Sequence, residues 1–370
     1  MRASASASVQ VSATPTGVRA HTAQTSQYVP AFDWLRAALA CTVMLHHDRV
    51  IPWPDAGRFA VQIFFVLSGW LIGRILLTST PADLPRFYFN RAIRIWVPYY
   101  VALTLLLAAS LLKDTVGPKW LEFVGYKLLM VWNLFGTPQL ADFTSLMPLK
   151  GTGNHFWSVN AEEQFYLISP FLLVLVPRWG RSVVLWSLLA ALALVTGNVY
   201  AGIALGVLAA IVVWKHGPLP SSRLAQAALV VVLLVCAFTL ASGGAFLLFA
   251  PLFGLAAVLL LAIPGAVSAG AKIAGGMSYP LYLNHWIGVF VGNALFAPLG
   301  MRESLSRQVF SAALNVAIAV CLYLYIDRKL LAHRASLFTR LRGIKAVAYA
   351  YAMIACGLAL GITMGFMPPT

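Results

Sequence analysis

The stretch FAVQIFFVLSGWLIGRILLT, residues 59–78, decides the fold class of this chain. It carries one charged residue, Arg74, and it has the length of roughly 20 residues that an apolar α-helix needs to cross a bilayer. Similar stretches recur through the 370 residues, of which 60% are hydrophobic and 10% charged. Soluble proteins are about 25% charged, and outer-membrane barrels show alternating rather than continuous apolar runs. The sequence therefore predicts an all-α, polytopic transmembrane helical bundle and excludes a soluble enzyme.

The apolar runs predict about 10–11 spans. The candidate spans share a length close to that of a membrane helix and cover 33–50, 59–78, 95–112, 158–177, 182–198, 199–214, 224–241, 244–263, 277–298, 306–327 and 346–366. Another apolar segment, 119–136, is interrupted by Glu122 and Lys127. Such an interruption predicts an interfacial or re-entrant helix.

The charges of the chain predict its orientation. The net charge is +15, from 26 Lys and Arg against 11 Asp and Glu. In a soluble domain this excess would suggest nucleic acid, but in a membrane protein basic residues collect in cytoplasmic loops. Placing the N-terminus inside assigns 18 of the 26 basic residues to the cytoplasmic side and 8 to the outside. We therefore expect an integral protein of the cytoplasmic (inner) membrane of a bacterium, with the N-terminus inside, the C-terminus outside and no nucleic-acid partner.

The chain divides into three parts by composition. Residues 1–30 are rich in Ser, Thr and Ala without an acidic residue, which predicts a disordered cytoplasmic tail. Residues 31–330 hold the membrane domain, and 331–370 a basic cytoplasmic segment with an extra C-terminal span. The four cysteines are isolated within apolar runs and lack metal-ligand spacing, so we expect them to pack in the bundle and predict no metal site.

Charged residues in the first span are candidates for function, because burying charge in a bilayer is costly. Arg36 and His47 are eleven residues apart, which places them on one helical face about 16 Å from each other, whereas His46 points about 80° away from Arg36. One interpretation is the polar wall of an active site or pore. The other is that Arg36 extends toward the cytoplasm while 46–49 form a wet outer cap.

Basic residues follow the second span. In FYFNRAIRIWVPYY, residues 87–100, Arg91 and Arg94 lie on one helical face, with Arg86 nearby in the preceding loop. Paired guanidinium groups suit a phosphate or diphosphate, and they also suit ordinary anchoring on the cytoplasmic side. In the middle of the second span, Ser68 and Gly69 allow either close helix packing or the approach of a ligand.

Two later motifs add polar side chains. In NHFWSVNAEEQFYLISP, residues 154–170, Asn160 and Glu163 fit a helix-capping box, which leaves Glu162 free. Both glutamates are expected on the outer side with His47, where a carboxylate can orient a histidine and raise its basicity. In MSYPLYLNHWIGVF, residues 277–290, His285 lies about eight residues into the predicted ninth span, either as a functional group or as a hydrogen-bonded core residue.

Together these motifs resemble the acyltransferase 3 family of integral membrane O-acyltransferases, over roughly residues 31–330. The matching phrases, in their usual order, are Arg36 and His47 with ten residues between, FFVLSGWLI at 64–72, Arg91-x-x-Arg94-Ile95 with Pro98 following, WSVNAEEQFY at 157–166, and SYPLYLNH at 278–285. The chain departs from the pattern at Gln62, where the family usually has an acidic residue.

The resemblance implies an O-acyltransferase of the stand-alone type, without an appended soluble domain. An acyl group, expected to be acetyl, moves from cytoplasmic acyl-CoA to a hydroxyl of a glycan or a natural product such as a macrolide. His47 takes the hydroxyl proton or carries the acyl group, Arg36 orients the donor or stabilises charge, and Glu162 and Glu163 belong to the catalytic group. The expected donor-binding residues are Arg74, Arg86, Arg91, Arg94, Ser68 and His285. No metal cofactor is implied.

An alternative function remains open from the sequence. A proton-coupled transporter also places Arg and His along a span as a proton relay. It is expected to show inverted repeats, and no clear repeat is visible in this chain. A non-catalytic scaffold is the third class, and it would tolerate loss of His47.

Overall fold

The computed structural model describes residues 28–217 and 222–365, and this part of the chain is helical with no strand. Nearly all of the predicted tail 1–30 lies outside these residues. The α-helices, in chain order, are α1 Pro30–His47, α2 Ala56–Leu77, α3 Leu84–Arg91, α4 Val97–Leu111, α5 Pro118–Leu128, α6 Trp132–Phe135, α7 Leu140–Phe143, α8 Phe156–Pro170, α9 Pro177–Gly180, α10 Val183–Val195, α11 Ala201–His216, α12 Arg223–Ala241, α13 Phe246–Leu261, α14 Ala269–Asn284, α15 Trp286–Phe296, α16 Leu305–Leu322, α17 Arg328–Leu337 and α18 Arg340–Gly365. The prediction of an all-α bundle is confirmed.

Five helices are long and apolar enough to cross a membrane on their own. They are Ala56–Leu77, Pro81–Leu111, Arg223–Ala241, Leu305–Leu337 and Arg340–Met364. Shorter apolar helices complete the bundle: α10, α11, α13 and the segment Trp286–Leu299. The polytopic membrane architecture is thus built from both long helices and shorter or broken ones.

Short π-helical turns join several of these helices without a loop. They are η2 Ala92–Trp96 between α3 and α4, η6 Phe171–Leu175 after α8, and η8 Tyr323–Asp327 between α16 and α17. The sequence predicts a loop that carries Arg86 after the second span, over about 79–94. This prediction is wrong, because most of these residues are the first part of a continuous 31-residue helix that ends at Leu111. Such π-turns are found frequently at functional sites.

Helix α2 is the centre of the bundle, and it packs most closely on α11. A side-chain carbon at Gly69 would lie 2.3 Å from the backbone oxygen of Ile203, and one at Gly206 would lie 2.2 Å from that of Val66. Only glycine at both positions lets the two helix backbones approach this closely. The interpretation of Gly69 as a packing residue is confirmed.

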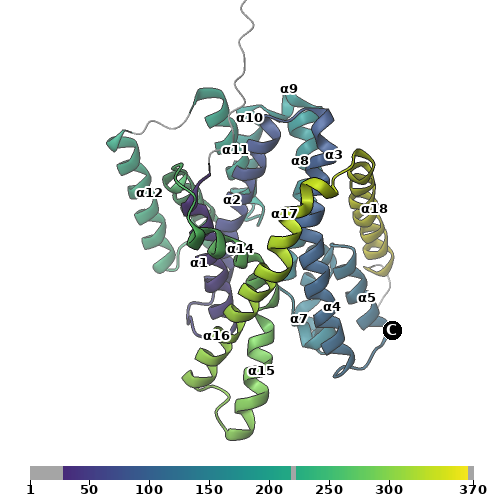
Figure 1. The fold of residues 1–370 in the computed structure, drawn as a ribbon. Helices are drawn as coiled ribbons and strands as arrows, with labels where there is room; N and C mark the ends of the chain where they lie inside the picture. Colours follow the sequence, from purple (N-terminus) through teal and green to yellow (C-terminus); the bar gives the residue numbers. More distant parts are fainter. Residues whose placement is uncertain (1–27, 218–221, 366–370) are drawn as a thin grey trace, which may run out of the picture.

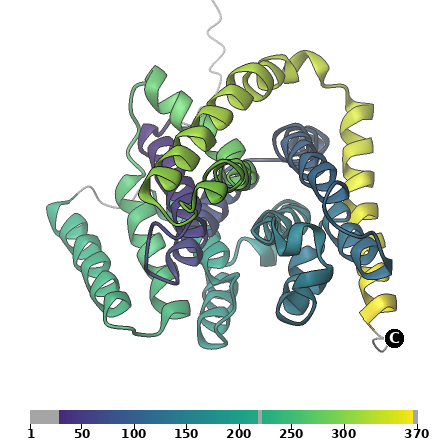
Figure 2. The ribbon, with the colours of Figure 1, turned by 90° about the horizontal axis from the view of Figure 1, so that it is seen from below.

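The outer helices present apolar side chains to the surroundings. Helices α12 and α18 lie at opposite edges of the molecule (Figures 1 and 2). In their apolar 18-residue stretches, only 11% and 17% of the residues are buried. Large exposed side chains such as Leu224, Phe238 and Ile362 lie on them. A soluble protein rarely exposes so much apolar surface, whereas a bilayer covers it.

The interrupted segment 119–136 is two helices, α5 and α6, and both of the charged residues that interrupt it, Glu122 and Lys127, are buried. The Lys127 amine donates to the backbone oxygen of Gly153 at 3.0 Å and lies 3.5 Å from the centre of the Trp132 ring. Glu122 accepts from the Tyr126 hydroxyl at 2.8 Å and pairs with Lys119. Both side chains that interrupt the apolar segment are thus held by partners inside the protein, and the interfacial or re-entrant placement of the segment stays a prediction.

Candidate active site

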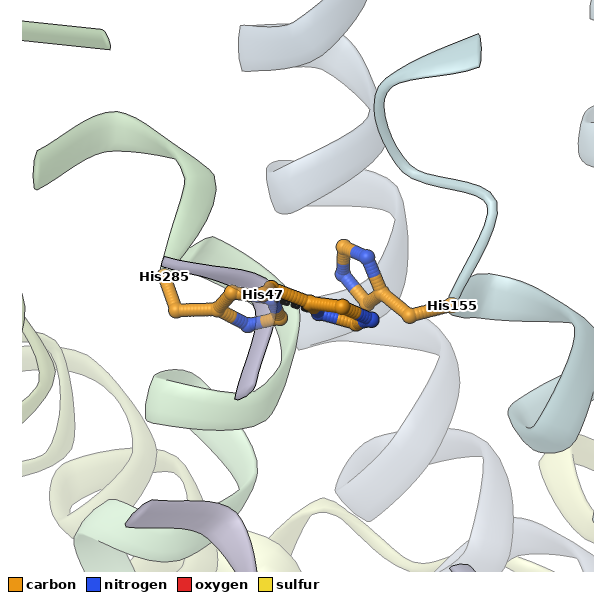
Figure 3. Close-up of side chains that lie close together, drawn as sticks. All are labelled: His47, His155 and His285. Atoms are coloured by element: carbon orange, nitrogen blue, oxygen red, sulfur yellow. Dashed lines mark hydrogen bonds between the residues drawn. The ribbon is translucent and has the colours of Figure 1, made fainter. Parts of the chain in front are cut away.

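Three histidines from distant parts of the sequence meet inside the bundle (Figure 3). His47 ends α1, His155 immediately precedes α8, and His285 lies between α14 and α15. His47 Nδ1 is 2.7 Å from His285 Nε2, and the centre of the His155 ring is 4.4 Å from that of His285 and 5.8 Å from that of His47. His155 and His285 are buried, whereas His47 is exposed. The cluster therefore has two histidines that are buried in the protein and one, His47, that a substrate can reach.

A helix break places His285 in this cluster. The sequence predicts one span over 277–298, but α14 ends at Asn284 and α15 begins at Trp286, so this prediction is wrong. Asn315 of α16 explains the break: its Nδ2 donates to the His285 backbone oxygen at 2.6 Å, and its Oδ1 accepts from the Gly288 backbone N–H at 2.8 Å. The amide thus satisfies backbone groups that a broken helix leaves unpaired.

The hydrogen-bond partners assign the protons on His47 and His285. His285 Nδ1 is 2.8 Å from the backbone oxygen of Tyr282, which can only accept, so Nδ1 carries the proton. The Nε2 of neutral His285 is then an acceptor, and His47 Nδ1 must donate to it. His47 Nε2 is left with its lone pair. An imidazole held in one tautomer by a second group is the arrangement that general-base catalysis uses.

His155 was missed by the sequence analysis. Its Nε2 lies 3.3 Å from the Leu283 backbone oxygen, and its own backbone oxygen accepts from the Tyr282 hydroxyl at 2.8 Å. The Lys127 amine donates to the backbone oxygen of Gly153, two residues before His155. No local pattern identifies His155, because its partners are about 130 residues away. Its position just before the WSVNAEEQFY phrase was the one signal that the sequence offered.

Helix α1 is held at its histidine end by a buried ion pair. Asp48 and Arg307 of α16 are 2.6 Å apart and nearly inaccessible, at 5% and 6% exposure of their side chains. Gln308 also donates to the Asp48 backbone oxygen at 3.3 Å. These contacts fix the residue next to His47 and exclude a fully wet cap at 46–49. His46 is half-buried, and its ring packs on Gly57 of α2.

The three histidines are also the residues best placed to hold a metal ion. Their ligand atoms lie within 4.8 Å of one another. In a tetrahedral site with zinc–nitrogen distances of about 2.0–2.1 Å, two nitrogens are roughly 3.3 Å apart. The 2.7 Å separation of His47 Nδ1 and His285 Nε2 is shorter, so this geometry fits a hydrogen bond better than a shared ion.

The two glutamates of α8 have other partners than those predicted. Helix α8 begins at Phe156 after His155, so Asn160 and Glu163 lie inside it and the predicted capping box is wrong. Glu162 accepts from the Ser68 hydroxyl at 2.7 Å and from the Tyr166 hydroxyl at 2.9 Å.

The partners of Glu163 and Asn160 complete this correction. Glu163 accepts from Trp96 Nε1 at 2.8 Å, and Asn160 accepts from the Trp132 backbone N–H at 3.1 Å. No hydrogen bond within residues 28–217 and 222–365 joins either glutamate to His47, whose orienting partner is His285. Neighbouring helices hold Glu162, Asn160 and one oxygen of Glu163, whereas Glu163 Oε2 is buried without a partner among the described residues.

The arginines gather at the other end of α1 from His47. Arg36 pairs with Asp33 at 2.8 Å, which also accepts from the Tyr28 hydroxyl at 2.7 Å. Arg94 is close enough to repel both Arg36 and Arg91. We name Arg36, Arg91 and Arg94 the arginine cluster. The structure thus brings these three predicted residues together, about 16 Å along α1 from His47.

The remaining donor-site candidates differ in their surroundings. Arg91 lies against the rings of Phe87 and Tyr166, each 5.8 Å from its guanidinium carbon. Arg86 is exposed and lies over the Phe338 ring at 5.3 Å, and Arg74 is exposed and lies over the Trp70 ring at 5.6 Å. Ser68 bonds Glu162, whereas His285 belongs to the histidine group.

Comparison with known proteins identifies the family. Residues 29–326 match a family model described as an acyltransferase domain, that of acyltransferase 3. The chain belongs to the acyltransferase 3 family. This match covers all the histidines, glutamates and arginines described above, and it ends just before α17. No solved structure matches the chain.

The acyltransferase 3 chain also has curated relatives. It is 33% identical to the peptidoglycan O-acetyltransferase OatA of Listeria monocytogenes over 167 residues, which are 42% of this chain and 26% of that protein. It is 34% identical over 164 residues to YrhL of Bacillus subtilis, provisionally named a peptidoglycan O-acetyltransferase, with coverage of 42% and 25%. The chain thus spans about a quarter of the length of the curated relatives it matches.

Proposed function

We propose that this protein is a membrane O-acetyltransferase that moves an acetyl group from acetyl-CoA to a hydroxyl of a carbohydrate or natural product. The observation that carries the proposal is the pair of His47 and His285, in which His47 Nε2 is left as a free base at the accessible end of the cluster. The family and the O-acetyltransferase names of the relatives support the same reaction.

The reaction balances with His47 as the only proton carrier. His47 Nε2 takes the proton of the acceptor hydroxyl while the hydroxyl oxygen attacks the thioester carbonyl carbon, and the imidazolium is stabilised by its hydrogen bond to His285. The new C–O bond forms and the C–S bond breaks. The thiolate of CoA then takes the proton from His47, which returns to its starting form. Covalent transfer through an acyl-histidine is the second route, with the same net balance.

The arginine cluster supports an anionic donor. Acyl-CoA carries phosphate groups, and guanidinium groups bind phosphate by charge-assisted hydrogen bonds. Arg91, Arg94 and Arg86 are without a carboxylate ion pair among the described residues. We infer that this end of the bundle faces the cytoplasm, in the inner membrane of a bacterium with the N-terminus inside, and that the reaction needs no metal.

The acceptor is inferred from chemistry and from the relatives. A hydroxyl nucleophile must reach His47 from the end of the bundle opposite the arginines. The Listeria relative is named for peptidoglycan, a carbohydrate polymer. We infer a carbohydrate hydroxyl as the first candidate acceptor and a natural-product hydroxyl as the second.

The test is acetyl transfer by the purified protein in lipid nanodiscs. Labelled acetyl-CoA is supplied with muropeptide fragments or with a macrolide, and both labelled product and free CoA are measured. We expect product with one acceptor class, CoA release in equal amount, and no change after treatment with a chelator. Absence of CoA release with every acceptor, in folded protein, would contradict the proposal.

A proton-coupled transporter is the second candidate, because α14 and α15 form a broken helix with a histidine at the break. Discontinuous helices carry binding sites in transporters. The same nanodisc preparation separates the functions, since a transporter releases no CoA from acetyl-CoA. Liposomes loaded with a pH-sensitive dye would instead show proton flux on addition of its substrate.

A further inference from the structure

The basic segment that follows the acyltransferase domain takes no part in the candidate active site. Six Lys and Arg residues fall between 328 and 345, and none of them forms an ion pair in the part of the chain that the structure describes. Helices α17 and α18 meet in this segment. Arg342 and Lys345 of α18 are exposed and three residues apart, which makes them neighbours on one helical face. We name them the basic pair.

The start of α18 is fixed beside α3. The Phe338 ring, at the corner between α17 and α18, lies 5.5 Å from that of Phe89. A side-chain carbon at Gly343 would lie 2.6 Å from the backbone oxygen of Pro85, so only glycine lets the two helices approach this closely. The basic pair is therefore held at the α3 end of the continuous α3–η2–α4 helix.

An apolar groove runs along the later part of that helix. It has a volume of about 620 Å³ and is lined by Trp96, Val97, Tyr100, Val101, Thr104 and Leu105. Val97, Val101 and Leu105 are exposed, so the groove is open to the surrounding bilayer. From Trp96 to Leu105 the helix rises by about 14 Å, which is roughly half of a hydrocarbon core about 30 Å thick. The groove thus has the length of an acyl chain in one leaflet.

One face of α18 connects the groove to the basic pair. Helix α18 runs beside α3 and α5 (Figure 1), and the Tyr100 hydroxyl donates to Met353 Sδ of α18 at 2.9 Å. Arg342 precedes Met353 by eleven residues, which places the two on one face of α18 about 16 Å apart. Arg340, by contrast, points about 140° away from Met353. Arg342 therefore lies on the groove side of α18, with Lys345 next to it.

We propose that this surface binds an anionic phospholipid of the bilayer, with an acyl chain in the groove and the headgroup phosphate at the basic pair. Arg and Lys bind phosphate by charge-assisted hydrogen bonds, and basic clusters beside a membrane span attract anionic lipid headgroups. Phe89, which contacts the corner before α18, lies seven residues, or about 10 Å, before Trp96 at the start of the groove. The charges thus stand beyond one end of the groove, as a headgroup stands beyond its acyl chain. The lipid is a bound partner, and its site does not depend on the proposed acetyl transfer.

Native mass spectrometry of the purified full chain tests the headgroup contact. The protein is released from micelles that hold equal amounts of phosphatidylglycerol and phosphatidylcholine with the same acyl chains, and the ratio of the two lipid adducts is measured. We expect a severalfold preference for phosphatidylglycerol, which the double variant Arg342→Gln, Lys345→Gln reduces to a ratio near one. The double control Arg223→Gln, Arg340→Gln removes the same charge from exposed positions off this face and should keep the preference. No preference in the native protein, or equal losses in the two double variants, would overturn the proposal.

A single variant separates lipid binding from a change in the corner itself. Arg342 also donates to the Leu337 backbone oxygen at 2.6 Å, so its replacement removes a contact that joins α17 to α18. Lys345→Gln leaves this contact in place and should lower the preference for phosphatidylglycerol by at least twofold. An unchanged ratio in Lys345→Gln would overturn the basic pair as the headgroup site.

A third pair of variants tests the groove. Thr104→Trp fills it, and Ala108→Trp, exposed one turn further along α4, is the matched control. The fraction of protein that retains one lipid with either headgroup is measured in the same spectra. We expect Thr104→Trp to lower this fraction severalfold and Ala108→Trp to leave it unchanged, because only the first occupies the space of the acyl chain. Full retention by folded Thr104→Trp, or an equal loss in the control, would overturn the groove as the acyl-chain site.

Discussion

At the scale of single residues, His47 differs from His46 in what each ring contacts. His47 bonds His285 and keeps one nitrogen free, whereas His46 packs on Gly57 and makes no contact with His285 in the described structure. Neighbouring histidines on a helix point about 100° apart, so only one of them can enter the cluster. The position that the motif and the helical face both select is the one that the structure places there.

The first prediction compares these two histidines. General acid–base catalysis contributes about 10²–10⁴-fold, so His47→Ala should lose activity by a factor in this range while expression and membrane insertion persist. His46→Ala should lose only packing and retain most transfer. Initial rates of product formation by both purified variants check this. A dead His46 variant beside an active His47 variant would refute the helical-face argument and the motif alignment together.

The second prediction concerns His285 as the residue that positions His47. His285→Ala removes the acceptor for His47 Nδ1–H, and the wrong tautomer then becomes accessible, so kcat should fall by about 10²-fold with KM unchanged. His285→Gln offers a side-chain oxygen as an acceptor and should recover part of the loss. The kcat and KM of both variants decide between roles, because a purely structural role predicts equal losses for Ala and Gln.

Gln62 shows how a departure from the family pattern fits its site. It is 2% exposed, and its Nε2 donates to the backbone oxygen of Val199 at 3.2 Å. An ionised carboxylate has no proton to donate to this carbonyl. The amide N–H therefore makes a contact between α2 and the residues just before α11 that an ionised carboxylate could not make, while Gln62 Oε1 has no partner among the described residues.

At the scale of helices, the two broken or bent elements carry the site. The α14–α15 break presents His285, and the continuous α3–η2–α4 helix carries Arg91 and Arg94. The break depends on a partner helix that pairs its free backbone groups. Asn315 does this for the break, because its one amide serves both an orphan oxygen and an orphan N–H.

The third prediction tests that amide. Asn315→Leu leaves the His285 oxygen and the Gly288 N–H buried and unpaired, which costs about 1–3 kcal/mol each. Thermal unfolding in detergent should occur several degrees lower, and transfer should fall because His285 shifts. Ala317→Leu, exposed on the same helix, is the control and should change neither quantity. An unchanged Tm for Asn315→Leu would show that the break does not depend on this contact.

The fourth prediction concerns the donor end. Replacing Arg91 and Arg94 with Ala removes charge-assisted contacts worth about 1.5–3 kcal/mol each, so the KM for acetyl-CoA should rise tenfold or more, with a smaller change for the acceptor. Arg58→Ala, at the histidine end of α2, is the control. If the donor KM of the double variant is unchanged in correctly inserted protein, these arginines serve only as cytoplasmic anchors.

The sequence could predict the parts of this design that are encoded locally. Apolar runs predict the helices, and the spacing of Arg36 and His47 predicts their shared face. The break at His285 could not be predicted, because its cause is Asn315, thirty residues later. His155 and the Glu162–Ser68 contact also depend on pairing between distant helices. For the same reason the predicted pairing of a glutamate with His47 is wrong: Glu162 bonds Ser68 and Glu163 bonds Trp96.

At the scale of the whole molecule, the arginine cluster and the histidines lie at different ends of α1. Arg36, Arg91 and Arg94 lie at one end of α1, and Arg334 of α17 is close to Arg94 at that end. The buried pair of Asp48 and Arg307 lies at the histidine end. Under the proposed function, the anionic donor would approach from the arginine end and the hydroxyl acceptor from the histidine end.

The last prediction is the orientation that this arrangement requires. Basic residues are retained on the cytoplasmic side during insertion, and acyl-CoA is a cytoplasmic metabolite, so the arginine cluster should face inward and the acceptor should enter from outside. Reporter fusions at residue 25 and at the C-terminus should place the N-terminus inside and the C-terminus outside, which requires an odd number of spans. Both reporters on one side would mean an even number of spans, and α18 would then not be a membrane span. An N-terminus found outside would turn the arginine cluster away from the donor, and a reaction that draws on cytoplasmic acyl-CoA would then have to begin at the histidine end.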